Sequence, residues 1–211
     1  MALTKLNTRS LPDNAVTSVK IQDDAVTSAK LGPDAGGPLV VISSNTTGGT
    51  SSTIEIDLST SLDYAYQMLN LRGFAGSAAE DMYMQMRKNS DNSWITDSYL
   101  SIIGSHFVNS SSTSSSQNGL WNGSYFRMVH NGMGTDTTHQ LNDMNIYFFN
   151  TANDKKFNVG YHRWGQSSSG VVQESGSGKG GYADVVNRFR LYLASGNIVW
   201  DEYTLYGFKR S

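Results

Sequence analysis

The chain has 211 residues, with 16 lysines and arginines against 18 aspartates and glutamates, a formal net charge of −2, and no cysteine. This balance disfavours nucleic-acid binding through phosphate neutralisation, and the lack of cysteine excludes disulfides and thiolate metal sites. No apolar run approaches the roughly 20 residues needed to span a bilayer, so we expect no membrane insertion. The start Met-Ala-Leu-Thr-Lys has no signal-peptide core, which predicts synthesis in the cytoplasm.

Two ten-residue repeats, 11–20 and 21–30, match position for position as [Leu/Ile]-x-Asp-x-Ala-Val-Thr-Ser-x-Lys, and a third copy decays after Ala35. Each unit has too few apolar residues to bury a core of its own. We therefore expect residues 1–37 to form an extended leader that docks on copies of itself or threads into a larger body. A disordered leader is the alternative.

The aliphatic positions of this leader recur every five residues, which fits neither the helical nor the strand period. An irregular extended stem with turns is therefore expected. In a parallel oligomer the residues that would meet around the axis and anchor the stem are Leu11, Val16, Ile21, Val26 and Leu31.

The decads resemble the repeats of bacteriophage tail-fibre and related virion-appendage proteins. The ending is similar as well, because 191–200 (LYLASGNIVW) and 204–208 (TLYGF) look like the close of many phage fibre tip domains. The resemblance implies a homotrimer in the virion, in which residues 1–35 contact other virion proteins and a compact C-terminal β domain follows. The short stem leaves tail and capsid attachment both open.

Residues 38–211 are expected to form an all-β domain, because 21 glycines, few prolines and short alternating runs are typical of many strands and turns. An antiparallel β-sandwich, jelly-roll-like, with two sheets of four to five strands is favoured over a β-barrel. Ten strands are predicted, at 39–42, 53–58, 64–71, 82–87, 94–103, 123–130, 144–149, 156–164, 187–193 and 201–208.

Alternation predicts which side chains of these strands point inward. Inward positions are expected at Ile54, Ile56 and Leu58 and at Phe189, Leu191 and Leu193. The stripe of Met82, Met84 and Met86 is expected to fill the core or an interface. If the chain is a trimer, this stripe and the apolar residues of 39–58 are predicted subunit contacts. The Ser-rich run 109–119 and the Gly/Ser-rich run 167–181 are predicted to be long solvated loops, the second with a short edge strand around Val171 and Val172 as an alternative.

No catalytic, cofactor or metal site is predicted. The histidines lie in separate segments without a metal-ligand spacing. The acid pairs are adjacent in sequence, which on a strand points their side chains to opposite faces, unlike the facing carboxylates of glycan-cleaving sites. The residues concerned are His106, His130, His139 and His162, and the pairs Glu80-Asp81 and Asp201-Glu202.

Carbohydrate recognition is the sharper hypothesis. Trp121 lies between two Asn-Gly turn signals, and an exposed aromatic ring with amide neighbours can stack on a sugar. The candidate glycan contacts are Trp121, Asn122 and Tyr125, the alternative being that Trp121 packs in the core or a trimer interface. A second candidate is Trp164, with its neighbours His162 and Arg163.

The expected function is that of a non-enzymatic virion structural protein, a homotrimeric tail fibre or appendage anchored by its N-terminus. Its β domain would contact the host surface, where a surface glycan is a candidate partner and three copies would bind with avidity. A capsid decoration protein or head fibre is the first alternative. A stand-alone carbohydrate-binding module or small glycan hydrolase is the second.

Overall fold

The computed structural model describes residues 39–59, 64, 66–130, 132–135, 142–149, 157–166, 170–180 and 184–208, with the backbone alone for 121, 122 and 166. All of them belong to the unit Pro38–Ser211. The predicted leader, including its five aliphatic anchor positions, therefore lies outside the described residues. Within the described residues no helix is long and apolar enough to cross a membrane.

The described residues form fourteen strands. In chain order they are β1 (Leu39–Asn45), β2 (Gly49–Ser51), β3 (Thr53–Asp57), β4 (Tyr66–Gly76), β5 (Met82–Lys88), β6 (Tyr99–Val108), β7 (Thr113–Gly123), β8 (Phe126–Arg127), β9 (Asn142–Phe149), β10 (Asn158–Gln166), β11 (Val171–Gly180), β12 (Val186–Leu193), β13 (Ile198–Trp200) and β14 (Glu202–Phe208).

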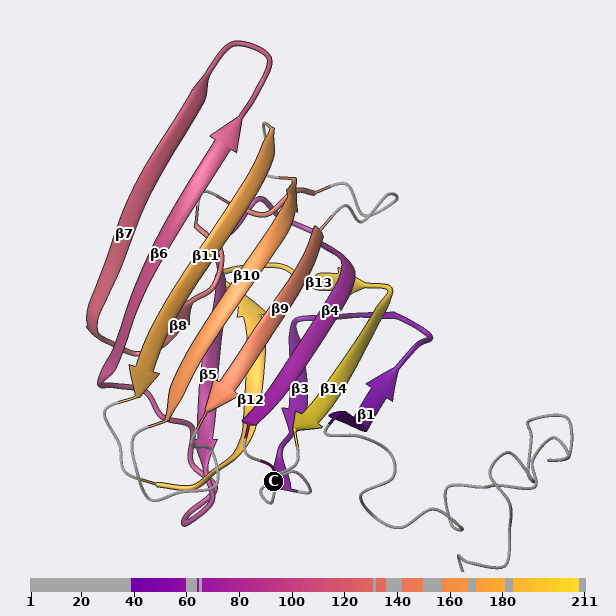
Figure 1. Ribbon diagram of the computed structural model, residues 1–211, viewed down its shortest axis with the longest axis vertical. Coiled ribbons are helices and arrows are strands. Elements are labelled where there is room, and N and C mark those ends of the chain that lie inside the picture. The colour runs from indigo at the N-terminus through magenta and orange to yellow at the C-terminus, as the bar shows by residue number, and fades with distance from the viewer. Residues whose placement is uncertain are drawn as a thin grey trace, which may run out of the picture. The chain divides into compact units, whose positions relative to one another are not determined.

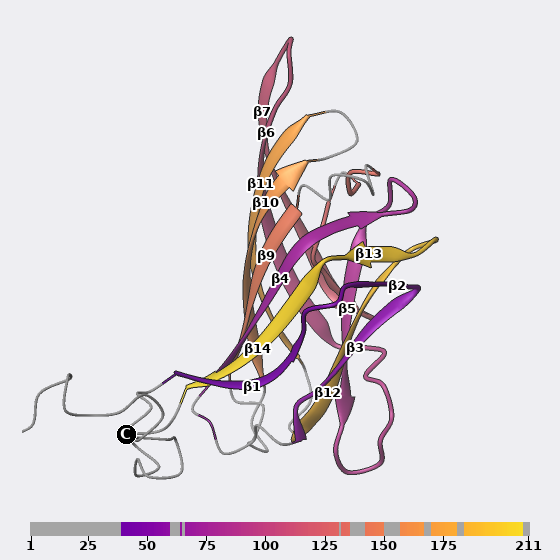
Figure 2. The same cartoon turned by 90° about the vertical axis from the view of Figure 1, so that its right-hand side faces the viewer.

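The strands build two antiparallel sheets that face each other (Figures 1 and 2). The large sheet has the order β1-β14-β4-β9-β10-β11-β6-β7, with β13 and β2 attached beside β4, and the small sheet has the order β3-β12-β5-β8. This confirms the predicted all-β antiparallel sandwich. The sheets are unequal, ten strands against four, where two sheets of similar size were expected.

The core lies between the two sheets and follows the predicted alternation. The inward positions of β3 and β12 are buried as expected. The methionine stripe is also fully buried and belongs to the hydrophobic core, so its prediction as a subunit contact was wrong. The reason is that β5 lies inside the small sheet, paired with both β12 and β8, and its methionines face the interior.

The run 109–119 was wrongly predicted to be a loop. Only a short turn remains, in which the Asn109 side chain accepts hydrogen bonds from the amides of Ser111 and Ser112 at 2.9 and 2.7 Å. The rest belongs to β7, which pairs with β6 along the edge of the large sheet. Polar side chains suit such a strand, because the pairing comes from the backbone and the side chains stay in water.

The run 167–181 was also misassigned, because β11 is a central strand between β10 and β6. Its inward positions Gly176, Gly178 and Gly180 lie against the aromatic rings of Tyr161, Phe126 and Phe157, and a Cβ at any of them would overlap a ring. The glycines therefore make room for aromatic side chains of the core within a strand, and they do not mark a flexible loop.

Candidate functional site

The face of the large sheet that points away from the small sheet, here called the open face, carries exposed apolar side chains. Every large hydrophobic residue exposed among the described ones lies on it. They are Leu39, Val41, Ile102, Val108, Phe149, Trp164 and Val171. A sheet face of this kind, unlike scattered single residues, is typical of a contact surface.

One register row crosses seven strands of the open face near the start of β1 and the end of β14. It runs through Leu39, Phe208, Tyr66, Phe149, Asn158, Lys179 and Leu100. The rings of Tyr66 and Phe208 stack with centroids 3.9 Å apart, and those of Tyr66 and Phe149 lie 5.6 Å apart. These three rings form what we call the aromatic ridge.

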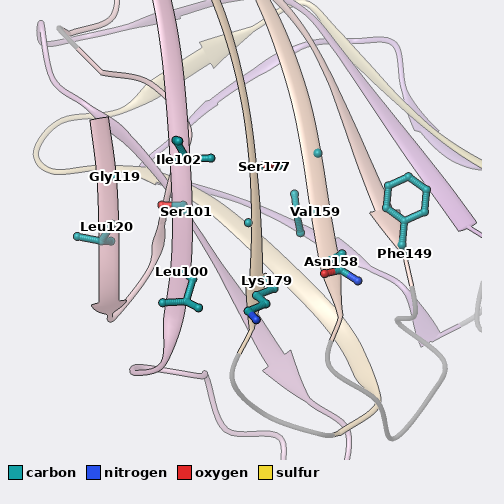
Figure 3. A pocket seen from close by; sticks show the side chains of 12 residues that line it. Leu100, Ser101, Ile102, Gly119, Leu120, Phe149, Asn158, Val159, Ser177 and Lys179 are labelled. Atoms are coloured by element: carbon teal, nitrogen blue, oxygen red, sulfur yellow. The ribbon is translucent and has the colours of Figure 1, made fainter. Parts of the chain in front are cut away.

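A groove of about 790 Å³ lies beside the aromatic ridge on the open face. Small residues of β10 and β11 form its floor, because Gly160 has no side chain there and Ser177 has a small one. Gly119 of β7 lies at the outer margin beyond Ile102. Phe149 borders the groove on one side and Ile102, with Leu100, on the other (Figure 3). We call it the apolar groove. The aromatic ridge and the apolar groove thus lie next to each other on the open face.

A more polar zone lies about 20 Å from the aromatic ridge, since Asp143 is six residues from Phe149 along β9 and each residue of a strand rises about 3.3 Å. Here Trp164 is 45% exposed and is paired across the sheet with Asp143 on β9 and Gln173 on β11. Together with Asn145 and His162 these residues form what we call the Trp164 patch.

The Trp164 patch is held by contacts among its side chains. The His162 ring meets the Trp164 ring edge to face, with centroids 4.1 Å apart, and lies 3.3 Å from the Gln173 amide nitrogen. The amide of Gly73 donates to Asp143 Oδ1 at 3.0 Å. On the neighbouring row, Asn145 Oδ1 accepts from the Asn70 amide at 2.7 Å.

The outer face of the small sheet has a different character, because its charged side chains are matched. Arg188 contacts both Glu55 and Asp57 at 3.2 Å. Arg190 donates two hydrogen bonds to Gln85 and lies over the Trp94 ring, 4.3 Å from its centroid. We find no unpartnered apolar patch among the described residues of this face.

The predicted glycan contacts are only partly described. The backbone of Trp121 and Asn122 lies in β7 at the edge of the large sheet, and their side chains lie outside the description. Tyr125 is half-buried next to the small sheet, with its ring 4.1 Å from that of Tyr83. The structure thus places Tyr125 in a tyrosine cluster, and this site stays a prediction.

Arg163 was grouped with Trp164 in the sequence, but the structure places it on the opposite face of β10. It is fully buried between the sheets and pairs with Glu174 of β11 at 2.6 Å. Its other terminal nitrogen donates to Asn142 Oδ1 at 2.8 Å. The alternation that points Val159 and Tyr161 inward also points Arg163 inward, and that signal could have identified it.

The buried pair continues into a polar network. Glu174 accepts a hydrogen bond from the backbone amide of His130, whose ring lies 3.8 Å from Asp81, and Asp81 also contacts Arg127 at 3.4 Å. Burial raises the pKa of the Glu174 carboxyl, while the Arg163 guanidinium opposes that rise. The Glu174 side chain has no exposed surface, so a substrate cannot reach it. The network joins the two sheets, because Glu174 belongs to β11 of the large sheet and Arg127 to β8 of the small sheet.

The described histidines do not converge. His106 and His162 lie on the open face, His130 belongs to the buried network, and His139 lies outside the described residues. Among the residues described, no group of three His, Cys, Asp or Glu side chains is placed to hold a metal ion.

The fold and these surfaces define an antiparallel β-sandwich with one open, partly apolar sheet face. The chain matches no protein-family model and no curated protein.

Proposed function

We propose that this chain is a non-enzymatic structural protein of a phage virion, a homotrimeric tail fibre or appendage that holds the particle by its N-terminal leader. The observation that carries the proposal is the aromatic ridge next to the apolar groove on the open face. The resemblance of the leader repeats to virion-appendage proteins supports it independently.

The ridge and the groove favour a second copy of the same chain as the partner. The ridge on one copy consists of three aromatic rings, and the groove on the next copy is apolar and is bordered by Phe149 and Ile102. Both surfaces are apolar, so one can pack against the other. The ridge and the groove adjoin at Phe149 but present different shapes, so such a contact runs head to tail, and it closes into a ring of three when each copy is rotated by a third of a turn from the last. Among the residues of the ridge and the groove, Lys179 alone carries a charge, which suits an interface with an apolar core.

The position of the ridge agrees with a shared leader. The chain enters the described fold at Leu39, which is the first residue of the ridge row. Three leaders bundled around an axis would bring the three Leu39 residues close to that axis. The part of the open face nearest Leu39 is then the part that neighbouring copies can cover.

In this arrangement the end of the domain that lies farthest from Leu39 is free to contact the host surface. Three weak sites, one on each copy, would act together there. A capsid decoration protein or head fibre would use the same trimer and differs in its place on the particle. Cryo-electron microscopy of the virion separates these two, because density for the leader lies either at the tail or between capsid subunits.

The trimer is tested by sedimentation of the full chain. The wild type is expected at three times the chain mass of 23.1 kDa. Phe149→Arg places a charge on the ridge and is expected to give monomers with unchanged circular dichroism. Thr53→Arg, on the outer face of the small sheet, is the matched control and should remain trimeric. A monomeric wild type, or a Phe149→Arg protein that stays trimeric, would contradict the proposal.

A further inference from the structure

The Trp164 patch has the composition of a ligand site and is not needed for the proposed trimer. We propose that it binds a neutral, pyranose-containing glycan, with one sugar ring stacked on Trp164. The inference deepens the proposed contact with the host surface, and its biological meaning rests on that function. The binding itself is a property of a single chain and is tested separately.

Trp164 provides the stacking surface. Its side chain is 45% exposed on a flat sheet, although the ring is fixed at one side by His162. A fixed indole loses little conformational entropy on binding, and its π-face is negative. The C–H groups on one face of a pyranose ring are weakly positive and apolar, so they pack well on such a surface.

Hydrogen-bonding groups flank the ring on both sides. Asp143 and Gln173 are the direct cross-strand partners of Trp164, one on each neighbouring strand. The Cα atoms of such cross-strand partners lie about 5 Å apart. A sugar ring centred on the indole therefore places its hydroxyl groups above both Asp143 and Gln173. The Gly73 amide binds Asp143 through Oδ1, and a carboxylate has acceptor capacity beyond one hydrogen bond.

The charges near the ring select against acidic sugars. Asp143 lies directly beside Trp164. Arg72, which lines the same surface pocket as Asp143, is paired with Glu202 at 2.6 Å. Within the described part of this face, a uronate or sialate carboxylate would therefore meet Asp143 while Arg72 is already held by another carboxylate, and like charges brought together are unfavourable. A neutral glycan avoids this repulsion and still donates hydroxyl hydrogens to the carboxylate.

The patch stays accessible in the proposed trimer. It lies about 20 Å along β9 from Phe149, at the end of the open face opposite to the aromatic ridge. Copies that meet at the ridge and the apolar groove therefore leave Trp164 in solvent. Three such patches on one trimer would give the avidity that a weak single site needs.

Saturation-transfer NMR with the full chain tests the site. The probes are the neutral hexasaccharides of cellulose, mannan and chitin, and hexagalacturonate as their acidic counterpart. We expect transfer to at least one neutral probe and none to hexagalacturonate. Trp164→Ala should reduce binding at least tenfold, and Trp164→Phe should keep part of it because a smaller aromatic face remains.

Phe149→Ala is the matched control, since Phe149 is an aromatic residue of similar exposure on the same face. It should keep the affinity for the hexasaccharide and weaken the trimer, whereas Trp164→Ala should stay trimeric and lose the sugar. Unchanged binding by Trp164→Ala, equal binding of hexagalacturonate, or no signal from any neutral probe would each overturn the glycan site. None of these results bears on the trimer, which sedimentation decides.

Discussion

Arg163 and Glu174 form an ion pair of 2.6 Å with both side chains withdrawn from solvent between the two sheets. The pair bridges neighbouring strands at the centre of the large sheet, and Asn142 and the His130 amide make further hydrogen bonds to it. Such a pair contributes little net free energy over apolar residues, but breaking it leaves one buried charge without a partner.

Arg163→Met is therefore expected to lower the free energy of unfolding by about 3–5 kcal/mol. Urea denaturation of the variant measures this loss. Arg163→Met combined with Glu174→Gln should cost less than the sum of the two single changes, because the residues are coupled. The control is Glu202→Gln, which breaks the exposed Arg72–Glu202 pair of the same length and should cost less than about 1 kcal/mol. Equal losses for the two pairs would contradict this account.

The buried glutamate also predicts a pH dependence. Burial raises the pKa of Glu174 above its ordinary value of 4.5, so the folded chain holds that proton more tightly than the unfolded chain. Stability contributed in this way is present at low pH and is lost as pH rises from 4.5 through the folded-state pKa. The wild type should accordingly lose stability relative to Glu174→Gln across that window. Denaturation of both proteins at a series of pH values tests this, and a wild type that gains stability relative to Glu174→Gln as pH rises would refute it.

The glycines of β11 predict a sharp contrast between two alanine variants. A Cβ at Gly178 would overlap the Phe126 ring and approach the Leu100 carbonyl, so Gly178→Ala should destabilise the fold by about 1–3 kcal/mol. A Cβ at Gly104, on the outer side of the neighbouring strand, would meet only the Ser175 carbonyl at 4.0 Å. Gly104→Ala should be neutral or slightly stabilising. Thermal unfolding compares the two, and similar melting temperatures would argue against the ring contacts.

The floor of the apolar groove gives a test of the trimer that leaves the fold intact. Nothing lies within 4 Å of a Cβ added at Gly160, so Gly160→Phe fits a single chain. The new ring would fill the groove that the neighbouring ridge is proposed to occupy. We expect monomers in sedimentation with an unchanged melting temperature at low protein concentration. A stable Gly160→Phe trimer would show that copies meet elsewhere.

The response of the trimer to salt follows from the same surface. One charged residue, Lys179, lies among those of the ridge and the groove, so screening of ion pairs should matter little. Sulfate strengthens the burial of apolar groups. We expect the trimer to tighten in ammonium sulfate at about 0.5 M and to be nearly unaffected by sodium chloride at the same ionic strength, as measured by the dissociation constant. Dissociation by sodium chloride would indicate a polar interface instead.

Sequence reasoning was most successful where strands alternate strictly. The inward residues of β3 and β12 are buried as predicted, because the period of two is a property of the strand itself. It failed for β11, where glycine and serine dominate. Those glycines face aromatic rings that come from two other segments, Phe126 of β8, and Phe157 and Tyr161 just before and within β10, and a single sequence does not state which segments pack together.

The candidate sites show the same limit. The sequence singled out Trp164, but its partners Asp143 and Gln173 are neighbours only through the register of three strands. Arg163, adjacent in sequence, turned out to face the interior. The ridge was likewise hidden, since Tyr66, Phe149 and Phe208 are far apart along the chain and meet only in the folded sheet.

The pairing of β1 with β14 has a consequence for how the protein is made. Leu39 pairs with Phe208, which is about 170 residues away in the sequence. Contacts between residues so far apart in the sequence make folding slow. At synthesis rates of about 5–20 residues per second, β1 waits on the order of ten seconds or more before β14 leaves the ribosome. During that interval the N-terminal segments of chains made on one messenger RNA are already in solution together. If the chain forms the proposed trimer, pairing of the leaders can therefore start before any copy of the β domain is complete.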